Sequence, residues 1–450
     1  MSSARFEPSG PLRGWLRPPS DKSISHRAAL IAAMAEGESE ITAFLDAADT
    51  RSTLAAVASL GAEVSTVPQA SWMNVAPELE GLPPDLRVAP SLGVRIRGVG
   101  LRRARTARID VGNAGTLLRL LPGWLAGQEG GRWLLDGDDS IRRRPVDRIA
   151  MPLREMGARL NCRNDRLPPL EIEGAPLRGI TYEMPIASAQ VKSCLLFAGL
   201  LAEGETRVLE PLPSRDHTER MLAAAGASVE RDGNTVVVQP AERLESGPVL
   251  VPADISSAAF FVVAALLVAG SDVALEGIGV NPTRTGLLTI LARMGAEIER
   301  EGEPVEGSGP IARLRIRSAP LRGTEVGGSE IPLAIDELPL VALAACFAEG
   351  TTTIRDAAEL RRKESDRIET VTAALRALGG KVEPTADGMV IEGTGGLRGG
   401  TIDSHGDHRI AMLGAVAGLA SREGVEVHGM DAAAISYPDF EADLASLSRR

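Results

Sequence analysis

The residues Ser20-Asp21-Lys22-Ser23-Ile24-Ser25-His26-Arg27 stand immediately before an apolar run of good helix formers, residues 28–34. Serine and aspartate commonly cap helix N-termini, so a helix is predicted to begin at Ser20 or Asp21. The free N–H groups and positive dipole end of such a first turn bind anions. The positive charges of Lys22 and Arg27 are unfavourable for helix stability at this positive end of the dipole. Because the same arrangement recurs along the chain, we interpret the turn as an anion site and not as a solvated helix start.

This helix belongs to a pattern that occurs six times in the chain. In each case an apolar, Ala- and Leu-rich segment ends at a glycine and a short strand pattern follows. The turn glycines are Gly37, Gly130, Gly204, Gly270, Gly350 and Gly424. Glycine is the residue type that ends helices, which supports this division. The repeated unit is longer than the repeats of open solenoids, so we expect folded subdomains.

A second helix is predicted after each of these strands. Five of the second helices close on a glycine, and these are Gly61, Gly157, Gly226, Gly295 and Gly379. The first helix of each unit is apolar nearly all round, which indicates burial, whereas the second carries charges on one side. A chain of 450 residues is too long for one core. Two groups of three units would make two domains, with the polar, proline-marked stretch 239–252 as linker.

The composition excludes several classes of function. The net charge is -11 and aromatic residues make up only 3%, which argues against a nucleic-acid or anionic-membrane surface. Cys162, Cys194 and Cys346 lie far apart without a CxxC pair, as in a reducing cytoplasm. The N-terminal residues contain no signal-peptide core, and the longest apolar run, 258–269, is too short to span a bilayer. We therefore expect a cytoplasmic protein without a membrane or nucleic-acid partner.

The residues that open the six apolar helices carry the main functional signal. If all six helices face one cleft between two domains, six positive dipole ends converge there and favour a small, multiply anionic ligand. Basic clusters near the joins of the units, at 142–144, at Arg215 and at 361–367, supply guanidinium groups that suit carboxylate and phosphate. Cations from the two domains would repel each other across an empty cleft, so we expect the free protein to be open.

Other chemistries are poorly supported by the sequence. Residues 112–116 are followed by neither a Walker lysine nor a dinucleotide-binding pattern. The run 403–409 contains two histidines and two aspartates, but Arg409 would repel a cation, so we interpret it as capping and substrate contact and expect no metal. The paired acids Asp336 and Glu337, together with Glu364, remain as acid–base candidates because they lie among cations.

Taken together, these motifs are similar to those of the 5-enolpyruvylshikimate-3-phosphate synthase family. The segments that carry the resemblance are Ser20 to Arg27, Asn113-Ala114-Gly115-Thr116, Arg144-Pro145, Ser188-Ala189-Gln190, the run Arg361-Arg362-Lys363-Glu364-Ser365-Asp366-Arg367, and Asp407-His408-Arg409. They extend over almost the whole chain in the family's order.

The resemblance implies an α/β fold of two domains, each made of three βαβαββ repeats in an inside-out barrel. By this resemblance the first domain spans 21–247, and the second combines 1–20 with 248–450. The implied reaction transfers the enolpyruvyl group of phosphoenolpyruvate to the 5-hydroxyl of shikimate 3-phosphate and releases phosphate, in the shikimate route to aromatic amino acids. No cofactor is implied, the family is the target of the phosphoenolpyruvate mimic glyphosate, and we expect a monomer.

The resemblance also implies the residues of the site. Those expected to bind shikimate 3-phosphate are Lys22, Ser23, Arg27, Ser188, Ala189, Gln190, Arg215, Asp336 and Lys363. Those expected to bind phosphoenolpyruvate are Lys22, Gly115, Arg144, Gln190, Arg367 and Arg409. The implied catalytic residues are Asp336, Glu364 and Lys22, acting through a tetrahedral phosphate ketal. Asp336 would accept the 5-hydroxyl proton and Glu364 would protonate the methylene carbon and later deprotonate it, although these two roles could be reversed.

The chain departs from the family pattern at three points. Ala189 stands where many members have serine, Leu117-Leu118-Arg119-Leu120 replaces Ala-Met-Arg-Pro, and Ile435 replaces a lysine, so that one phosphoenolpyruvate contact is not carried over. Two alternatives remain open. UDP-N-acetylglucosamine enolpyruvyl transferases share the fold, but usually have Lys-Asn at Lys22-Ser23 and a reactive cysteine in the loop at 137–142. A non-catalytic anion-binding protein would not need both Asp336 and Glu364.

Overall fold

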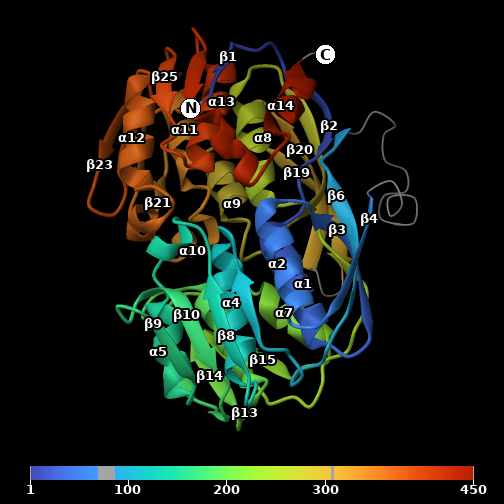
Figure 1. Ribbon diagram of the computed structural model, residues 1–450. Coiled ribbons are helices and arrows are strands. Elements are labelled where there is room, and N and C mark those ends of the chain that lie inside the picture. Colours follow the sequence, from blue (N-terminus) through green and yellow to red (C-terminus); the bar gives the residue numbers. More distant parts are fainter. Residues whose placement is uncertain (1, 69–86, 306–308, 449–450) are drawn as a thin grey trace.

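The computed structural model describes residues 2–68, 87–305 and 309–448, which fold into six small α/β units (Figure 1). Five units contain four strands that lie in their sheet in the βαβαββ order first, second, fourth, third, and the sheet of unit six has three strands. In units one, four and six one strand comes from a distant part of the chain, namely β17 (Val249–Leu250), β2 (Arg13–Arg17) and β1 (Ser3–Phe6) respectively. The first two strands of a unit are parallel, and the third and fourth pair in antiparallel fashion, as in unit one. The predicted repeat of six α/β units is therefore confirmed.

The first three units form what we call the first half of the molecule. Unit one consists of β17 (Val249–Leu250), α1 (Lys22–Met34), β3 (Glu38–Leu45), α2 (Ala48–Ser59), β4 (Glu63–Pro68) and β6 (Ser91–Arg97). Unit two consists of β7 (Ala107–Asp110), α4 (Gly115–Ala126), β8 (Arg132–Asp136), α5 (Asp147–Glu155), β9 (Arg159–Arg163) and β10 (Leu167–Glu173). Unit three consists of β12 (Thr181–Glu183), α6 (Ala189–Gly199), β14 (Thr206–Leu209), α7 (His217–Ala224), β15 (Val229–Asp232) and β16 (Thr235–Val238), beside the short pair β11 (Leu177–Arg178) and β13 (Ala202–Glu203).

The other three units form the second half. Unit four consists of β2 (Arg13–Arg17), α8 (Ile255–Leu267), β18 (Asp272–Gly279), α9 (Gly286–Arg293), β19 (Ile298–Val305) and β20 (Gly309–Arg317). Unit five consists of β21 (Glu325–Val326), α10 (Ile331–Ala334), α11 (Leu338–Phe347), β22 (Thr351–Ile354), α12 (Arg367–Ala377), β23 (Lys381–Pro384) and β24 (Met389–Glu392). Unit six consists of β25 (Gly400–Asp403), α13 (His408–Ala420), β26 (Val425–His428), α14 (Phe440–Ser448) and β1 (Ser3–Phe6), which takes the place of the fourth strand.

The turn glycines have the backbone conformation that the repeat requires. All six that precede the second strand of a unit have φ between 76° and 96°. An L-residue with a Cβ rarely adopts this region, whereas glycine enters it without steric penalty. The glycines allow each buried helix to reverse directly into the next strand, as the sequence predicted.

The six apolar helices are buried, and they build two separate hydrophobic cores. In α8 every residue from Ile255 to Leu266 is buried. One core contains side chains from Ile24 to Val251 and corresponds to the first half. The other contains Leu12 and Leu16 together with side chains between residues 253 and 447, and corresponds to the second half. In Figure 1 the N-terminal strands β1 and β2, in blue, accordingly lie among the yellow to red elements of the second half.

The two crossings of the chain between the halves lie side by side. Ser20 and Ala253 form an isolated antiparallel bridge. The amide of Asp21 donates to the carbonyl of Pro252 at 2.7 Å, and the amide of Asp254 donates to the carbonyl of Pro19 at 2.8 Å. We call this pair of crossings, residues 19–21 and 252–254, the hinge. Backbone hydrogen bonds between the two segments make them a single local structure.

Two details differ from the expectation. Val251 belongs to the core of the first half and Ala253 to that of the second, so the second crossing lies between these two residues. This is beyond the expected boundary at 247/248, because β17 pairs with β3 of the first half. The short strand β5 (Arg87–Val88) pairs with β2 and so lies in the sheet of unit four. No pattern in the sequence indicated either pairing, because strands of two residues leave no periodic signal. The domain ranges 21–247 and 1–20 plus 248–450 therefore remain a proposal, which the two cores support.

Candidate active site

The centre of the candidate site is Asp336, at the end of the segment that follows α10. Its carboxylate accepts hydrogen bonds from Lys363 Nζ at 3.0 Å and from Arg367 Nη1 at 3.4 Å, both from the second half. It also accepts one from Arg215 Nη2 at 2.6 Å, from the first half. Burial alone would raise the pKa of Asp336, but these cations and Arg409 outweigh it and hold the pKa well below its ordinary value. Asp336 is therefore an anion that organises cations from both halves.

A second carboxylate, Glu364, lies next to this cluster. Its Oε2 accepts a hydrogen bond from Arg367 Nη2 at 2.8 Å, and its side chain is 34% exposed. Burial raises the pKa of Glu364, but Arg367, Lys363 and Arg144 outweigh that effect and lower the pKa below its ordinary value. Arg144 belongs to the first half, so Glu364 also feels charge from both halves.

Arg367 is fixed in place by its own neighbours. Only 1% of its side chain is exposed, and its guanidinium contacts both oxygens of Asp407, with Nε donating to Oδ2 at 2.9 Å. Asp407 also caps α13 by accepting from the amide of Arg409 at 2.9 Å. Because a buried guanidinium needs a paired carboxylate, Asp407 determines where Arg367 points.

The first half contributes a second group of polar contacts. Lys22, the first residue of α1, donates from Nζ to Asp49 Oδ2 at 3.1 Å. Arg27 is buried and donates to Thr218 at 2.7 Å and to Ser193 at 3.0 Å, and burial lowers its pKa to about 10. The basic residues of α1 are thus held by neighbouring helices instead of extending into solvent.

Gln190 and Gly115 lie at the starts of α6 and α4 respectively. Gln190 accepts from Arg119 Nη1 at 3.0 Å and donates to Thr116 Oγ1 at 3.3 Å. A Cβ placed on Gly115 would lie 2.7 Å from Arg144 Nη1, so the glycine allows the guanidinium to approach the first turn of α4. That turn has no side-chain cap, which leaves its N–H groups available to an anion.

The six helix starts expected to face one cleft differ in whether they are capped. Four of the six helices are capped by their own side chains, namely Asp21 on α1, Ser188 on α6, Asp254 on α8 and Asp407 on α13. Each cap occupies one of the free N–H groups at its helix start, and the three carboxylate caps also offset the positive end of the dipole that an anionic ligand would use. Ser188 was expected to contact substrate, and its hydroxyl accepts from the amide of Val191 at 3.4 Å.

The expected repulsion between the halves is smaller than sequence reasoning suggested, because the cations have partners. Lys22 pairs with Asp49, Lys363 with Asp336, and Arg409 with Glu337. Besides the pair Arg215–Asp336, Arg148 and Glu359 form an ion pair at 3.0 Å that joins the two halves. The structure therefore shows the halves in contact.

Sequence reasoning missed four residues of this site: Asp49, Arg119, Asp407 as a partner of Arg367, and the role of Glu337. Asp407 and Glu337 were visible as acids beside a named motif. Asp49 and Arg119 offered only a weak signal, a charged residue one turn or less into a helix. Ser23 and Ala189 have no side-chain hydrogen bond among the described residues, so their roles rest on the resemblance alone.

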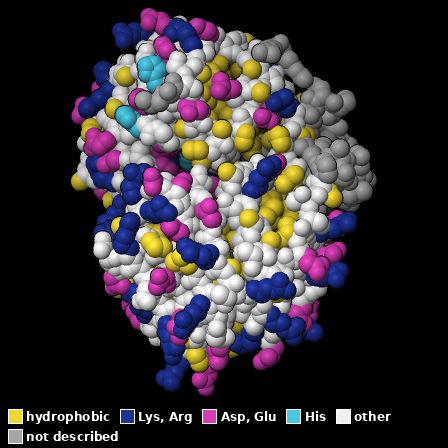
Figure 2. All heavy atoms as spheres, in the orientation of Figure 1, with side chains coloured by type: hydrophobic (Ala, Val, Ile, Leu, Met, Phe, Trp, Pro, Cys, Tyr) yellow, Lys and Arg dark blue, Asp and Glu magenta, His cyan; other side chains and the backbone are white. Residues whose placement is uncertain are grey.

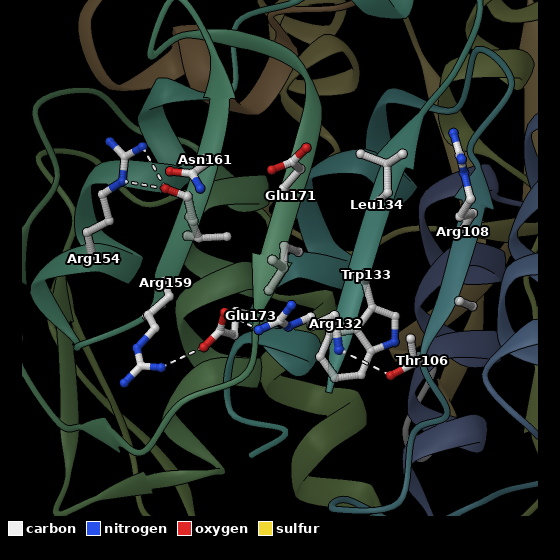
Figure 3. A pocket seen from close by; sticks show the side chains of 14 residues that line it. Thr106, Arg108, Arg132, Trp133, Leu134, Arg154, Arg159, Asn161, Glu171 and Glu173 are labelled. Atoms are coloured by element: carbon white, nitrogen blue, oxygen red, sulfur yellow. Dashed lines mark hydrogen bonds and ion pairs between the residues drawn. The ribbon is translucent and has the colours of Figure 1, made fainter. Parts of the chain in front are cut away.

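One hollow lies elsewhere and is not part of this site. This hollow has a volume of about 660 Å³ and lies on one face of the sheet β7-β8-β10-β9 (Figure 3). Three of its four basic side chains have partners: Arg159 and Arg132 pair with Glu173, at 2.6 Å and 3.4 Å, and Arg154 donates to the carbonyl of Leu160 at 2.9 Å. None of the expected substrate-binding residues lines it.

On the face drawn in Figure 2, Lys and Arg side chains are interspersed with Asp and Glu. Within the described parts of the chain, no group of three or more His, Cys, Asp or Glu residues is arranged to hold a metal ion. Among the described helices, none combines the length and apolar character needed to cross a membrane.

Comparison with known proteins identifies the family. The family model of EPSP synthase (3-phosphoshikimate 1-carboxyvinyltransferase) matches residues 6–94 and 91–444. A 3-phosphoshikimate 1-carboxyvinyltransferase of Synechococcus sp. (strain JA-3-3Ab) is 48% identical over 98% of this chain and 96% of its own length. One from Desulfitobacterium hafniense (strain DSM 10664 / DCB-2) is 47% identical over 97% of this chain and 95% of its own length.

Solved structures agree with the sequence comparison. The structure of EPSP synthase from Acinetobacter baumannii covers 100% of this chain and 98% of its own, with a TM-score of 0.86 and 40% identity. The two-domain enolpyruvyl transferase fold expected from the sequence is confirmed. The repeat, the paired cations around Asp336 and these full-length matches lead to one conclusion: the chain belongs to the EPSP synthase (3-phosphoshikimate 1-carboxyvinyltransferase) family.

Proposed function

We propose that this chain transfers the carboxyvinyl group of phosphoenolpyruvate to the 5-hydroxyl of shikimate 3-phosphate and releases phosphate, in the shikimate route to aromatic amino acids. The observation that carries the proposal is the cluster around Asp336, in which Arg215 of the first half meets Lys363 and Arg367 of the second. Both substrates carry a phosphate and a carboxylate, and a site between two halves must offset about four anionic groups. Membership of the family supports the same reaction.

The substrate contacts follow the positions of the cations. The residues proposed to hold shikimate 3-phosphate are Lys22, Ser23, Arg27, Ser188, Ala189, Gln190, Arg215, Asp336 and Lys363. Phosphoenolpyruvate is proposed to bind at Lys22, Gly115, Arg144, Gln190, Arg367 and Arg409. The close approach of Arg144 to Gly115 supports the second set, because an uncapped helix start and a guanidinium there face the same small volume.

The chemistry is an addition followed by an elimination. Protonation of C3 of phosphoenolpyruvate makes C2 electrophilic, and the 5-oxygen of shikimate 3-phosphate bonds to C2 as its proton leaves to a base. Loss of a C3 proton then expels phosphate from C2. We assign the base for the hydroxyl to Asp336 and the proton transfers at C3 to Glu364, with Lys22 stabilising charge. The assignments of Asp336 and Glu364 can be exchanged without changing the balance of the reaction.

In this proposal, Asp336 and Glu364 can transfer protons only when the negative charges of the bound substrates offset the surrounding cations. The surrounding cations lower the pKa of both Asp336 and Glu364, and a carboxyl group with a low pKa accepts a proton weakly. Phosphate and carboxylate groups bound to Lys363, Arg215 and Arg367 would weaken that effect and raise both pKa values toward the working pH. In this proposal the substrates themselves adjust the acid–base groups that act on them.

We propose a cytoplasmic monomer whose two domains, 21–247 and 1–20 plus 248–450, close on the substrates. The two hydrophobic cores and the twofold crossing at the hinge support this division.

A phosphate-release assay tests the function. The protein is mixed with phosphoenolpyruvate and either shikimate 3-phosphate or UDP-N-acetylglucosamine, and we expect phosphate only with the first acceptor. Lys363→Met should abolish release. Lys381→Met is the matched control, because Lys381 is 61% exposed and pairs with Glu392 on the surface of the same half. Phosphate release with UDP-N-acetylglucosamine would favour the alternative enolpyruvyl transferase. A lack of release with both acceptors would favour the non-catalytic anion-binding protein.

A further inference from the structure

Glu337 is a buried acid that the proposed mechanism leaves without a role. It directly follows Asp336, yet it is only 1% exposed and is not among the residues assigned to either substrate. Its Oε1 accepts a hydrogen bond from Arg409 Nη1 at 3.3 Å and another from the hydroxyl of Ser256. A buried carboxylate is costly unless it is paired, so these two contacts account for its stability in this position.

The hydroxyl of Ser256 connects Glu337 to a buried arginine. Ser256 accepts from Arg284 Nη2 at 2.7 Å and donates its only hydroxyl proton to Glu337. Arg284 is 3% exposed. The result is a continuous chain of hydrogen bonds from Arg284 through Ser256 and Glu337 to Arg409.

Arg284 is at the same time bound to the hinge. Its Nη1 donates to Asp21 Oδ2 at 3.2 Å and its Nη2 donates to Asp254 Oδ1 at 3.0 Å. These two aspartates cap α1 and α8, the helices that begin directly after the two crossings. Burial would lower the pKa of Arg284, but Asp21 and Asp254 outweigh it and raise the pKa above its ordinary value. The guanidinium therefore joins the start of one helix from each half.

The segment that carries Arg284 also contacts the first half directly. Asn281 donates from Nδ2 to Asp216 Oδ1 at 2.5 Å. Asp216 is the neighbour of Arg215, which pairs with Asp336 across the two halves. Residues 281–284 thus contact the hinge through Arg284 and, through Asn281, the chain neighbour of the proposed substrate-binding residue Arg215.

We infer that Arg284, Ser256 and Glu337 are positioning residues that fix the guanidinium of Arg409 relative to the hinge. Arg409 Nη1 donates both to Glu337 and to the carbonyl of Asp336 at 2.8 Å, so its direction depends on Glu337. A rotation of the halves moves Asp21 relative to Asp254 and therefore acts on this chain. The inference rests on the proposed function, in which Arg409 binds phosphoenolpyruvate. A small displacement of a substrate-binding guanidinium can lower rate and affinity many-fold.

Three single variants test the inference in the full-length protein. Glu337→Gln keeps the shape of the side chain and removes its charge, and Ser256→Ala removes the hydroxyl that links Arg284 to Glu337. The matched control is Ser257→Ala, the next residue of α8, which is also buried and whose hydroxyl has no hydrogen bond among the described residues. KM for phosphoenolpyruvate, kcat, and the dissociation constant of shikimate 3-phosphate are measured for each, together with the melting temperature.

We expect KM for phosphoenolpyruvate to rise about 10-fold in Glu337→Gln and a few-fold in Ser256→Ala, the scale of one lost hydrogen bond to a charged group. The dissociation constant of shikimate 3-phosphate should stay within about twofold. In the double variant the two effects should be less than additive, because either change alone already interrupts the chain. Ser257→Ala should match the unaltered protein.

Two results would overturn the inference. One is an unchanged KM for phosphoenolpyruvate in both Ser256→Ala and Glu337→Gln. The other is an equal rise in KM for phosphoenolpyruvate and in the dissociation constant of shikimate 3-phosphate, together with a lower melting temperature. That result would indicate a purely structural network. Failure of the proposed function is distinguishable, because the unaltered protein would then release no phosphate, or Arg409→Lys would leave KM for phosphoenolpyruvate unchanged.

Discussion

Arg215 Nη2 of the first half lies 2.6 Å from Asp336 Oδ2 of the second half. This single contact joins a residue proposed to bind the phosphorylated acceptor to the residue proposed to deprotonate it. The partners are 21% and 16% exposed, so solvent screens the pair only partly. An anionic substrate that binds Arg215 competes directly with Asp336, and binding is thereby coupled to the freeing of the base.

Binding of shikimate 3-phosphate should tighten the contact between the halves. The acceptor supplies anions to cations of both halves and so favours the closed arrangement by its differential affinity. We expect the radius of gyration from small-angle scattering to fall on saturation. Arg215→Gln should weaken acceptor binding about 10-fold, whereas Arg207→Gln, an exposed residue paired with Glu205, should not. A radius that stays constant on saturation argues against closure.

Removal of the two acids should separate chemistry from binding. Glu364→Gln should lower turnover about 10²-fold or more, because a proton-transfer group is lost, while the affinity for shikimate 3-phosphate stays within about tenfold. Asp336→Asn should lower turnover similarly and also weaken acceptor binding, because Arg215 and Lys363 lose their partner. Stopped assays and acceptor titrations measure both quantities, with Glu392→Gln as a surface control. Near-normal turnover in both variants would remove these acids from the mechanism.

Gly115 should determine the response to glyphosate, a phosphonate-bearing mimic of phosphoenolpyruvate. A Cβ at this position would lie 2.7 Å from Arg144 Nη1, so the guanidinium must move into the space available to a ligand. We expect inhibition of the unaltered protein, and in Gly115→Ala a larger loss of affinity for glyphosate than for phosphoenolpyruvate, because the longer ligand tolerates less displacement.

The inhibition constant against phosphoenolpyruvate measures this effect. Gly247→Ala is the control, because a Cβ there has no heavy atom within 4 Å. Resistance of the unaltered protein would show that Leu117 and Leu120, the departures in the same turn, shape the site instead.

Buried histidines should make the fold sensitive to mild acid. His26 is fully buried against Thr53, and burial lowers its pKa to about 3. The unfolded chain binds a proton near pH 6.5 and the folded chain does not, so stability is present above pH 6.5 and is lost as the pH falls toward 3. Protonation of His26 in the unfolded chain should lower the free energy of unfolding by about 2 kcal/mol between pH 6.5 and 4.5.

Thermal melts across this range test the assignment. The melting temperature of His26→Gln should fall less steeply with decreasing pH than that of the unaltered protein. His405→Gln, a change at an exposed position, should keep the unaltered slope. Parallel slopes in all three proteins would show that His26 does not contribute.

The sequence predicted those parts of the fold that leave a local or periodic signal. The six apolar helices, the turn glycines and the basic first turn of α1 could be read from neighbouring residues. The hinge arginine Arg284 could not, because its partners Asp21 and Asp254 are far from it in the chain and from each other. Asp49 was missed for the same reason, since only the packing of α2 on α1 brings it to Lys22. Capping at 403–409 was predicted, but not that the capping residue Asp407 would also bind the guanidinium of Arg367, which is forty residues away in the chain.

The strand β1 has a consequence for how the protein emerges from the ribosome. Ser3 pairs with His428, and Arg13 of β2 pairs with Asp272, so these N-terminal residues pair with strands that are made much later. Residues 24–251 contain a complete core of their own, and can fold while translation continues. Apart from the short pairing of β2 with β5, strands β2 and β1 must wait for their partners until unit four and then unit six have been made. Co-translational folding of this chain therefore starts in its interior, and the N-terminal strand is among the last elements to find its place.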